Sequence, residues 1–274
     1  MKKKLGKPFS EGGLNNYFDY KLVMRIISGH QPCYLPWLGL FHKLSLCDCF
    51  VFMDTVQYLE QDWNNRNKIR TSQGWQWLSI PVDRNRTKGK SLNQIYLQNL
   101  SSVSPKEFWQ EKHWLSIVHN YGKSPFFSLY AEQFEQFYRG TLWDRLTDLC
   151  FEQLKFFLRI LELDTIELVR MSEHHFAGSK DELILDHCLK LHGDAVVFGM
   201  HGKDYVRSEI FHEHGVQVYF QDYQHPVYTQ KYPQFESHMA LIDLLFNHGP
   251  ESREILLRGN RTKEDLLTGR YWVK

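Results

Sequence analysis

The sequence has few of the features that would place it in a specialised class of protein. Within its 274 residues no run of about 18 apolar residues occurs, so we expect no membrane-spanning helix. Cysteine is sparse, at five residues, and no C-x-x-C spacing occurs, which disfavours a disulfide framework and a structural zinc site. The 33 basic and 32 acidic residues nearly cancel, so net charge gives no strong nucleic-acid signal. These absences leave a globular protein with local binding sites as the expected class.

Three patterns that identify well-known catalytic sites are also missing. The chain contains no G-x-x-x-x-G-K-[ST] phosphate loop, no H-E-x-x-H zinc motif and no G-x-S-x-G nucleophile elbow. Its histidines are scattered without metal-ligand spacing, so we predict no bound metal, and the sequence identifies no cofactor. The chemistry has to be inferred from where polar residues fall in the fold.

Aromatic residues, by contrast, are abundant. They make up 15% of the chain, with eight Trp, fourteen Tyr and nineteen Phe, whereas hydrophobic residues at 42% and charged residues at 24% are at ordinary globular levels. Large rings serve the core first, but they also line pockets for sugars and bases. Each candidate ring therefore has core packing as its alternative role.

The chain divides by pattern into an extension, a main domain and a tail. Residues 1–23 lack the apolar core and the small-residue cleavage site of a signal peptide, and Met24-Arg25 stands directly before an apolar strand. We therefore predict a cytoplasmic protein with an N-terminal extension over residues 1–23, an α/β domain over 24–255 and a C-terminal tail over 256–274.

The order of apolar segments predicts an α/β fold with a mostly parallel, Rossmann-like sheet. A strand at 25–28, a loop, a helix at 38–46 and a strand at 49–53 form a βαβ unit. A second alternating passage follows, with strands and helices at 165–170, 181–191, 195–198, 204–213 and 216–220. Between the two passages we predict a hairpin around Gln73-Gly74 and a helical layer over about 105–162, with amphipathic runs at 105–120 and 125–161. A last helix is predicted at 239–246.

The loop after the first strand is the strongest candidate site. In open α/β sheets, ligands bind at the carboxyl ends of the strands, where His30 falls. Gln31, Tyr34 and Trp37 add an amide, a phenol and a large ring, which suit a polar ring or a base. In the alternative reading, Tyr34 and Trp37 pack in the core and His30 only braces the loop.

Residues after the second strand should approach this loop from its neighbour. We predict that Asp54 orients the His30 imidazole and that Gln57 lies beside it. Asn65, Arg66 and Lys68 follow in a run of amides and cations that suits phosphate oxygens, with a solvated turn as the alternative.

The second half of the chain repeats strand-to-helix turns that could contact anions. Ser172 and Lys180 lie around one helix start, and Lys203 and Tyr205 lie in the next such turn. Tyr223 and His225 form a chemically rich segment without a clear structural assignment. All six are predicted to bind substrate.

Several motifs in order resemble the WbqC-like proteins of bacterial surface-polysaccharide gene clusters. The resemblance covers about residues 25–255 and is carried by the segments 30–39, 54–57, 65–69, 74–78, 199–205, 223–228 and 242–250. Members have been proposed to attach glycine to an amino sugar of the O-antigen. The resemblance therefore implies acyl transfer to a nucleotide-linked sugar from an activated acyl donor.

The first βαβ unit is also similar to nucleotidyltransferase-type folds, in which a His-containing loop after the first strand binds phosphates. Those enzymes carry a second His or Gly-His shortly downstream, where this chain has Trp37 and Gly39. That departure puts direct adenylyl transfer in doubt.

We therefore expect a transferase in surface-polysaccharide biosynthesis. In this hypothesis His30 is the general base that deprotonates the sugar amine, and the cations Arg66, Lys68 and Lys203 hold phosphates in one cleft. The alternatives are a non-catalytic protein that binds a sugar nucleotide or an acyl carrier, and a nucleotidyltransferase.

Overall fold

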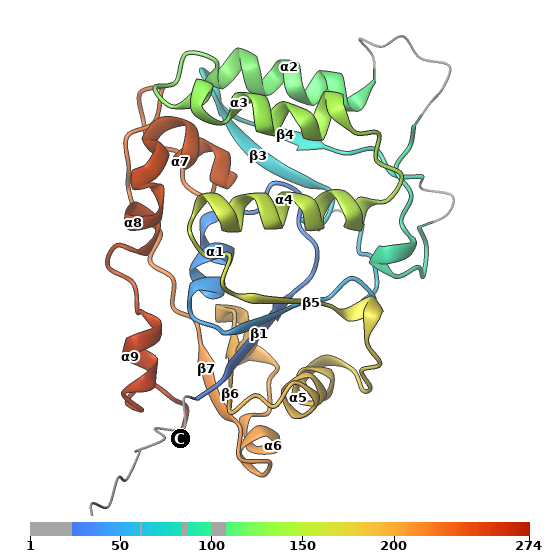
Figure 1. Ribbon diagram of the computed structural model, residues 1–274, viewed down its shortest axis with the longest axis vertical. Helices are drawn as coiled ribbons and strands as arrows, with labels where there is room; N and C mark the ends of the chain where they lie inside the picture. The colour runs from blue at the N-terminus through green and yellow to red at the C-terminus, as the bar shows by residue number, and fades with distance from the viewer. Residues whose placement is uncertain (1–23, 61, 84–86, 100–107) are drawn as a thin grey trace, which may run out of the picture.

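The computed structural model describes residues 24–60, 62–83, 87–99 and 108–274, and the N-terminal extension lies outside them. At its centre is a five-stranded parallel sheet (Figure 1). Its order is β5 (Glu167–Arg170), β2 (Cys49–Phe52), β1 (Ile26–His30), β6 (Ala195–Phe198) and β7 (Gln217–Phe220). The predicted Rossmann-like α/β fold is confirmed, and β1 is the central strand.

Both faces of the sheet are apolar because its strands are covered on both sides. In β1, Ile26 packs in one hydrophobic cluster and Ile27 in a second, on the opposite face. Val197 and Val196 of β6 alternate in the same way. Successive strand side chains point to opposite faces, so two layers of helices are needed to cover this sheet.

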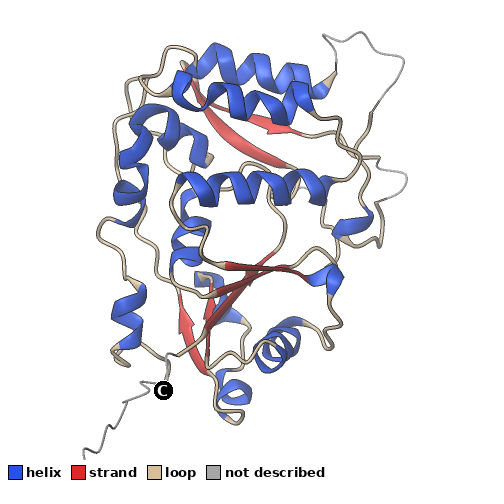
Figure 2. Ribbon diagram, in the orientation of Figure 1, coloured by secondary structure: helices blue, strands red, loops and turns tan. Residues whose placement is uncertain are grey.

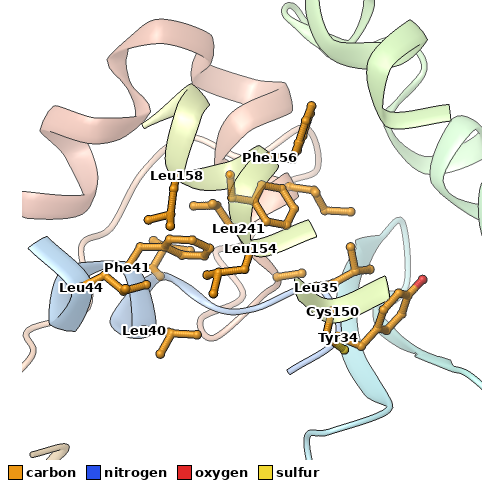
Figure 3. Packing of buried hydrophobic residues seen from close by; sticks show 14 of the residues in the cluster. Tyr34, Leu35, Leu40, Phe41, Leu44, Cys150, Leu154, Phe156, Leu158 and Leu241 are labelled. Carbon is orange, nitrogen blue, oxygen red and sulfur yellow. The ribbon is translucent and has the colours of Figure 1, made fainter. Parts of the chain in front are cut away.

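The helices that cover the two faces come from different parts of the chain. α1 (Leu38–Ser45) and α4 (Leu146–Ile160) contribute to the first cluster, whose packing Figure 3 shows around Phe41 and Leu154. α5 (Lys180–Lys190) and α6 (Ser208–His212) contribute to the second cluster and lie on the other side of the sheet (Figure 1).

A smaller layer lies beyond α4. The antiparallel hairpin of β3 (Arg66–Thr71) and β4 (Gly74–Ser79) is covered by α2 (Trp109–Tyr121) and α3 (Phe127–Glu135), as Figure 2 shows. The prediction of a single helical run over 125–161 is wrong. α3 ends in a π-helical turn, η4 (Gln136–Gly140), and the chain is extended at Thr141 and Arg145 before α4 begins. The predicted start at 104–105 lies outside the described residues.

The turn after β6 also differs from the expected helix over 204–213. It forms a 3-10 helix, η6 (Met200–Asp204), and α6 begins only at Ser208. Arg207 is extended, and its guanidinium donates to Asp181 at 2.8 Å and 3.0 Å. The Arg207 backbone amide also donates to Asp181, at 3.2 Å, so it does not form a helical hydrogen bond.

The C-terminal part of the chain folds back along the sheet. α7 (Leu241–His248), η7 (Gly249–Glu251), α8 (Ser252–Leu257) and α9 (Lys263–Leu267) follow one another, and Leu266 is fully buried. The Val273 amide donates to the Val218 carbonyl at 2.8 Å, so the last residues cover the outer edge of β7. Two further 3-10 helices are η2 (Leu92–Gln94) and η5 (Met171–Glu173). Over the described ranges, no helix has the length and apolar character to cross a membrane.

Candidate functional site

His30 is the last residue of the central strand, and its ring is held in one orientation. Nδ1 lies 2.8 Å from the backbone carbonyl oxygen of Gln31. Because a carbonyl only accepts, Nδ1 carries the hydrogen and Nε2 presents a lone pair. Burial, together with the ammonium of Lys43, lowers the pKa of His30 to about 3. The imidazole is therefore neutral across the physiological pH range.

Lys43 is a site residue that the sequence reasoning missed. It lies on α1, is only 4% exposed, and its Nζ donates to the Gly29 carbonyl oxygen at 2.8 Å. Burial lowers the pKa of Lys43 to about 8. The signal was a lysine in the middle of the largely apolar segment 38–46. A buried ammonium is costly, so its bond to the residue directly before His30 suggests a role in the site.

Cys33 lies against the same ring nitrogen and the same carbonyl oxygen. Its Sγ is 3.5 Å from Nδ1 of His30 and 3.3 Å from the Gln31 carbonyl oxygen. Burial raises the pKa of the Cys33 thiol, so the thiolate is not populated at neutral pH. Cys33 braces the loop and is a poor nucleophile.

The predicted binding role of Tyr34 is wrong. Its side chain is fully buried, beside Cys150 in Figure 3, and its hydroxyl lies 2.9 Å from Nδ1 of His113 and 2.8 Å from the hydroxyl of Tyr138. A ring enclosed in the core cannot contact a ligand. The packing alternative therefore holds for Tyr34, because the loop turns this residue inward.

Trp37, from the same loop, is only partly buried and begins a row of four tryptophans. The His30 ring meets Trp37 edge-on at 5.4 Å between centroids. Trp37 lies 6.2 Å from Trp63, Trp63 lies 5.2 Å from Trp77, and Trp77 lies 5.6 Å from Trp75. We call Trp37, Trp63, Trp77 and Trp75 the aromatic row. It connects the end of β1 to the β3–β4 hairpin.

Two of the predicted phosphate-binding residues lie on the aromatic row. The Arg66 guanidinium is 4.7 Å from the Trp77 centroid, and the Lys68 ammonium is 4.3 Å from the Trp75 centroid and 5.4 Å from that of Trp77. Trp75 and Trp77 are 42% and 36% exposed. Cations on exposed indoles form an accessible surface that offers both positive charge and flat rings.

The amide side chains predicted to bind substrate near the aromatic row mainly form hydrogen bonds within the protein. Asn65 donates to the Ile80 carbonyl oxygen at 2.8 Å, and the Gln31 side chain accepts from Asn64 at 3.2 Å. Gln57 is exposed and forms a bridge with Ser91. Of these three predicted residues, only Gln57 has a largely exposed side chain.

Asp54 has partners other than the predicted one. Its carboxylate is fully buried and accepts from the backbone amide and hydroxyl of Ser172 at 2.8 Å and 2.7 Å, and from Arg170 at 3.2 Å. Among the described residues it shares no hydrogen bond with His30, so the predicted orienting pair is wrong. The Gln31 carbonyl orients the imidazole instead. Asp54 ties the end of β2 to the end of β5.

The remaining predicted residues of the second half do not gather around His30. Tyr223 stacks on His42 at 5.1 Å and donates to the Leu256 carbonyl oxygen, and His225 lies against Tyr228. Lys180 and Tyr205 have exposed side chains. Within the described part of the chain, none of the four forms a hydrogen bond or ring contact with His30 or the aromatic row.

Lys203 lies in a different place from the one predicted. It lines a cavity of about 510 Å³ together with Tyr219, Asp222, Arg261 and Tyr271. No described residue that lines this cavity belongs to the aromatic row or to the loop from His30 to Trp37. The expected single cleft is therefore divided between the aromatic row and this cavity.

One family model and one curated relative each match most of the chain. The model of the WbqC-like protein family matches residues 31–255, a range that begins one residue after His30 and includes the whole aromatic row. The uncharacterized protein Rv1507c of Mycobacterium tuberculosis is 29% identical over 234 residues, which cover 85% of this chain and 98% of that protein. No solved structure matches the chain.

Proposed function

This chain belongs to the WbqC-like protein family, and from that premise we propose that it is a cytoplasmic transferase in surface-polysaccharide (O-antigen) biosynthesis. Its substrate is a nucleotide-linked amino sugar, and the group transferred is glycine or another acyl group from an activated donor. The observation that carries this proposal is the aromatic row with its two cations, Arg66 and Lys68. The first ring of the row, Trp37, contacts the neutral imidazole of His30.

The aromatic row supports binding of a nucleotide-linked sugar. Exposed indole faces stack against sugar rings and bases, and arginine and lysine bind phosphate oxygens. Trp75 and Trp77 are 42% and 36% exposed, and the cations Arg66 and Lys68 lie against their rings. A bound diphosphate would lie near these two cations, with the sugar directed along the row towards Trp37 and His30.

The orientation of His30 supports a role at the reacting amine. The amine nitrogen attacks the acyl carbonyl carbon, a C–N bond forms, and the bond from that carbon to the leaving group breaks. The proton that the nitrogen loses passes to Nε2 of His30, the ring nitrogen left without a hydrogen when Nδ1 donates to Gln31. The nitrogen of the addition intermediate is positively charged and more acidic than a free ammonium group, which eases proton transfer to this weakly basic imidazole.

Lys43, Asp54 and Arg170 support the site without contacting substrate. Lys43 binds the Gly29 carbonyl immediately before His30, and Asp54 fixes Ser172 and Arg170 at the neighbouring strand ends. These contacts hold the carboxyl edge of the sheet in one arrangement, which favours a preorganised site.

One observation favours a second candidate, a protein that binds a sugar nucleotide without turnover. General bases work best when their pKa lies near the operating pH, and the pKa of His30 is lowered to about 3. In a binding protein the neutral imidazole would act only as a hydrogen-bond acceptor. The aromatic row serves both candidates equally.

Calorimetric titration with nucleotide-linked amino sugars tests the binding step that the two candidates share. We expect Trp77→Ala to weaken binding at least about tenfold, because it removes the central ring of the exposed face. The matched control is Tyr96→Ala, an aromatic side chain of similar exposure, at 43%, outside the row. Equal affinity of the Trp77→Ala variant and the wild type would contradict the assignment of the row.

A further inference from the structure

A cavity at the outer edge of the sheet is distinct from the aromatic row. Its volume is about 510 Å³, within the range of small-molecule sites. Three segments form its walls: the turn that carries Lys203, the end of β7 at Tyr219, and the C-terminal segment from Gly259 to Val273. That last segment lies beyond residue 255, where the match to the family ends.

The wall formed by residues 259–261 is fixed to the body of the protein. The Asn260 side chain accepts from the Gln224 backbone amide at 2.8 Å and donates to the Gln224 carbonyl at 3.0 Å. Nε2 of His42 lies 2.9 Å from the Arg261 carbonyl oxygen and donates to it. These contacts place both residues before any ligand arrives, so little ordering cost remains for binding.

The wall formed by residues 271–273 is also fixed to the body of the protein. The Val273 amide donates to Val218, and Trp272 meets the Tyr219 ring edge-on at 6.4 Å. The Arg261 guanidinium lies 4.3 Å from the centroid of the Tyr271 ring. The guanidinium is planar, with N–H groups that match phosphate oxygens, and contact with the ring holds that plane in one orientation.

The chemistry of the lining suits an anion that also carries a flat ring. The lining holds two cations, Lys203 and Arg261, and one carboxylate, Asp222, which accepts from the Gln224 side chain at 3.2 Å. Aromatic rings complete the lining, from Tyr219, Phe220 and Tyr271. Stacking rings beside paired cations are the elements that recognise a base and its phosphate.

We propose that this cavity is a second ligand site, which binds a nucleoside phosphate independently of the sugar nucleotide assigned to the aromatic row. The inference does not depend on the proposed transferase activity, because it rests on the cavity and its lining alone. A ligand held here would contact Lys203 and Arg261 through its phosphate and the tyrosine rings through its base.

Calorimetric titration of the full chain with nucleoside 5′-monophosphates and with inorganic phosphate tests this site. We expect a nucleoside monophosphate to bind more tightly than phosphate, because only the nucleotide uses the rings. Arg261→Gln and Lys203→Gln should each weaken nucleotide binding about tenfold or more, through the loss of one charge-assisted contact. Arg258→Gln is the matched control, since Arg258 is an exposed arginine immediately before this segment and pairs with Glu254.

Each outcome decides the question. Loss of nucleotide affinity in the Arg261 and Lys203 variants, with wild-type affinity in Arg258→Gln, supports the second site, whatever the effect of Lys68→Gln at the aromatic row. Loss in Lys68→Gln alone would place the nucleotide on the aromatic row and overturn the inference. Absence of nucleotide binding, or equal affinity for phosphate and nucleotide, would also overturn it, and none of these results bears on turnover at His30.

Discussion

The Lys68 ammonium lies 4.3 Å from the centroid of the Trp75 ring, and this contact joins the cationic strand β3 to the aromatic strand β4. Neighbouring residues extend it: Arg66 lies over Trp77, and Trp77 continues through Trp63 towards Trp37. The hairpin thereby presents charge and flat rings on one surface that leads to His30.

The first prediction concerns the charge on that surface. Lys68→Gln should weaken binding of a nucleotide-linked sugar about tenfold, and the dependence of affinity on salt should decrease, because one phosphate contact is lost. Calorimetric titrations at two salt concentrations measure both effects. Lys112→Gln, an exposed lysine of α2, is the control. An unchanged affinity in Lys68→Gln would contradict the phosphate assignment.

The second prediction concerns the buried ammonium of Lys43. Replacement by methionine, which has a similar volume, removes a buried charge that has only one described acceptor, the Gly29 carbonyl. We expect Lys43→Met to raise the free energy of unfolding by about 1–3 kcal/mol and to impair turnover. Urea denaturation at pH 7 measures the first effect. A destabilised Lys43→Met variant would mean that Lys43 is retained for folding.

Lys43 also acts on the protonation of His30. Its ammonium adds to burial in lowering the pKa of His30, so Lys43→Met should raise that pKa from about 3. An NMR titration of the His30 ring protons in both proteins measures the change. A His30 pKa that is the same with and without Lys43 would show that burial accounts for the whole shift.

The third prediction is a loss of stability in mild acid. Burial lowers the pKa of His113 to about 3 and that of His187 to about 4, whereas both titrate near 6.5 in the unfolded chain. Below pH 6.5 the unfolded state therefore binds more protons, and the free energy of unfolding falls as pH falls towards these values. Between pH 6.5 and 5.5 we expect a loss of about 1 kcal/mol for each histidine.

Urea denaturation at pH 7.5, 6.5 and 5.5 measures this loss. Carboxylates titrate mostly below this window, so histidines dominate the change. His113→Phe should reduce the slope between pH 6.5 and 5.5, because one neutral buried imidazole is removed while Tyr34 keeps its contact with Tyr138. A stability that is constant across the three pH values would contradict the buried neutral state of these histidines.

The sequence predicted the sheet well because its short strands alternate with helices in two passages, β1–α1–β2 and β5–α5–β6–α6–β7. That order determines a parallel arrangement, and it placed His30 at the carboxyl edge. The helical layer was less predictable. The break between α3 and α4 follows from an extended segment around Thr141 and Arg145 that periodicity does not reveal.

Within the candidate site, the local sequence pattern could not distinguish residues that pack in the core from nearby residues that reach the site. Tyr34 and Trp37 lie in one loop, yet only the tertiary packing decides that the first enters the core and the second meets His30. Lys203 follows a strand as expected, but β6 lies between β1 and β7, so its turn reaches the outer cavity. The contact between Lys43 and the Gly29 carbonyl depends likewise on how α1 packs against β1.

The most direct test of the account is turnover by the purified protein with and without His30. Wild type and His30→Ala are incubated with a nucleotide-linked amino sugar and an activated glycyl donor, and the sugar product is measured by mass spectrometry. We predict that the wild type adds one glycyl group, and that His30→Ala binds the sugar nucleotide with near-normal affinity but loses at least about 99% of the activity. A His30→Ala variant with full activity would contradict the role assigned to the loop at the end of β1.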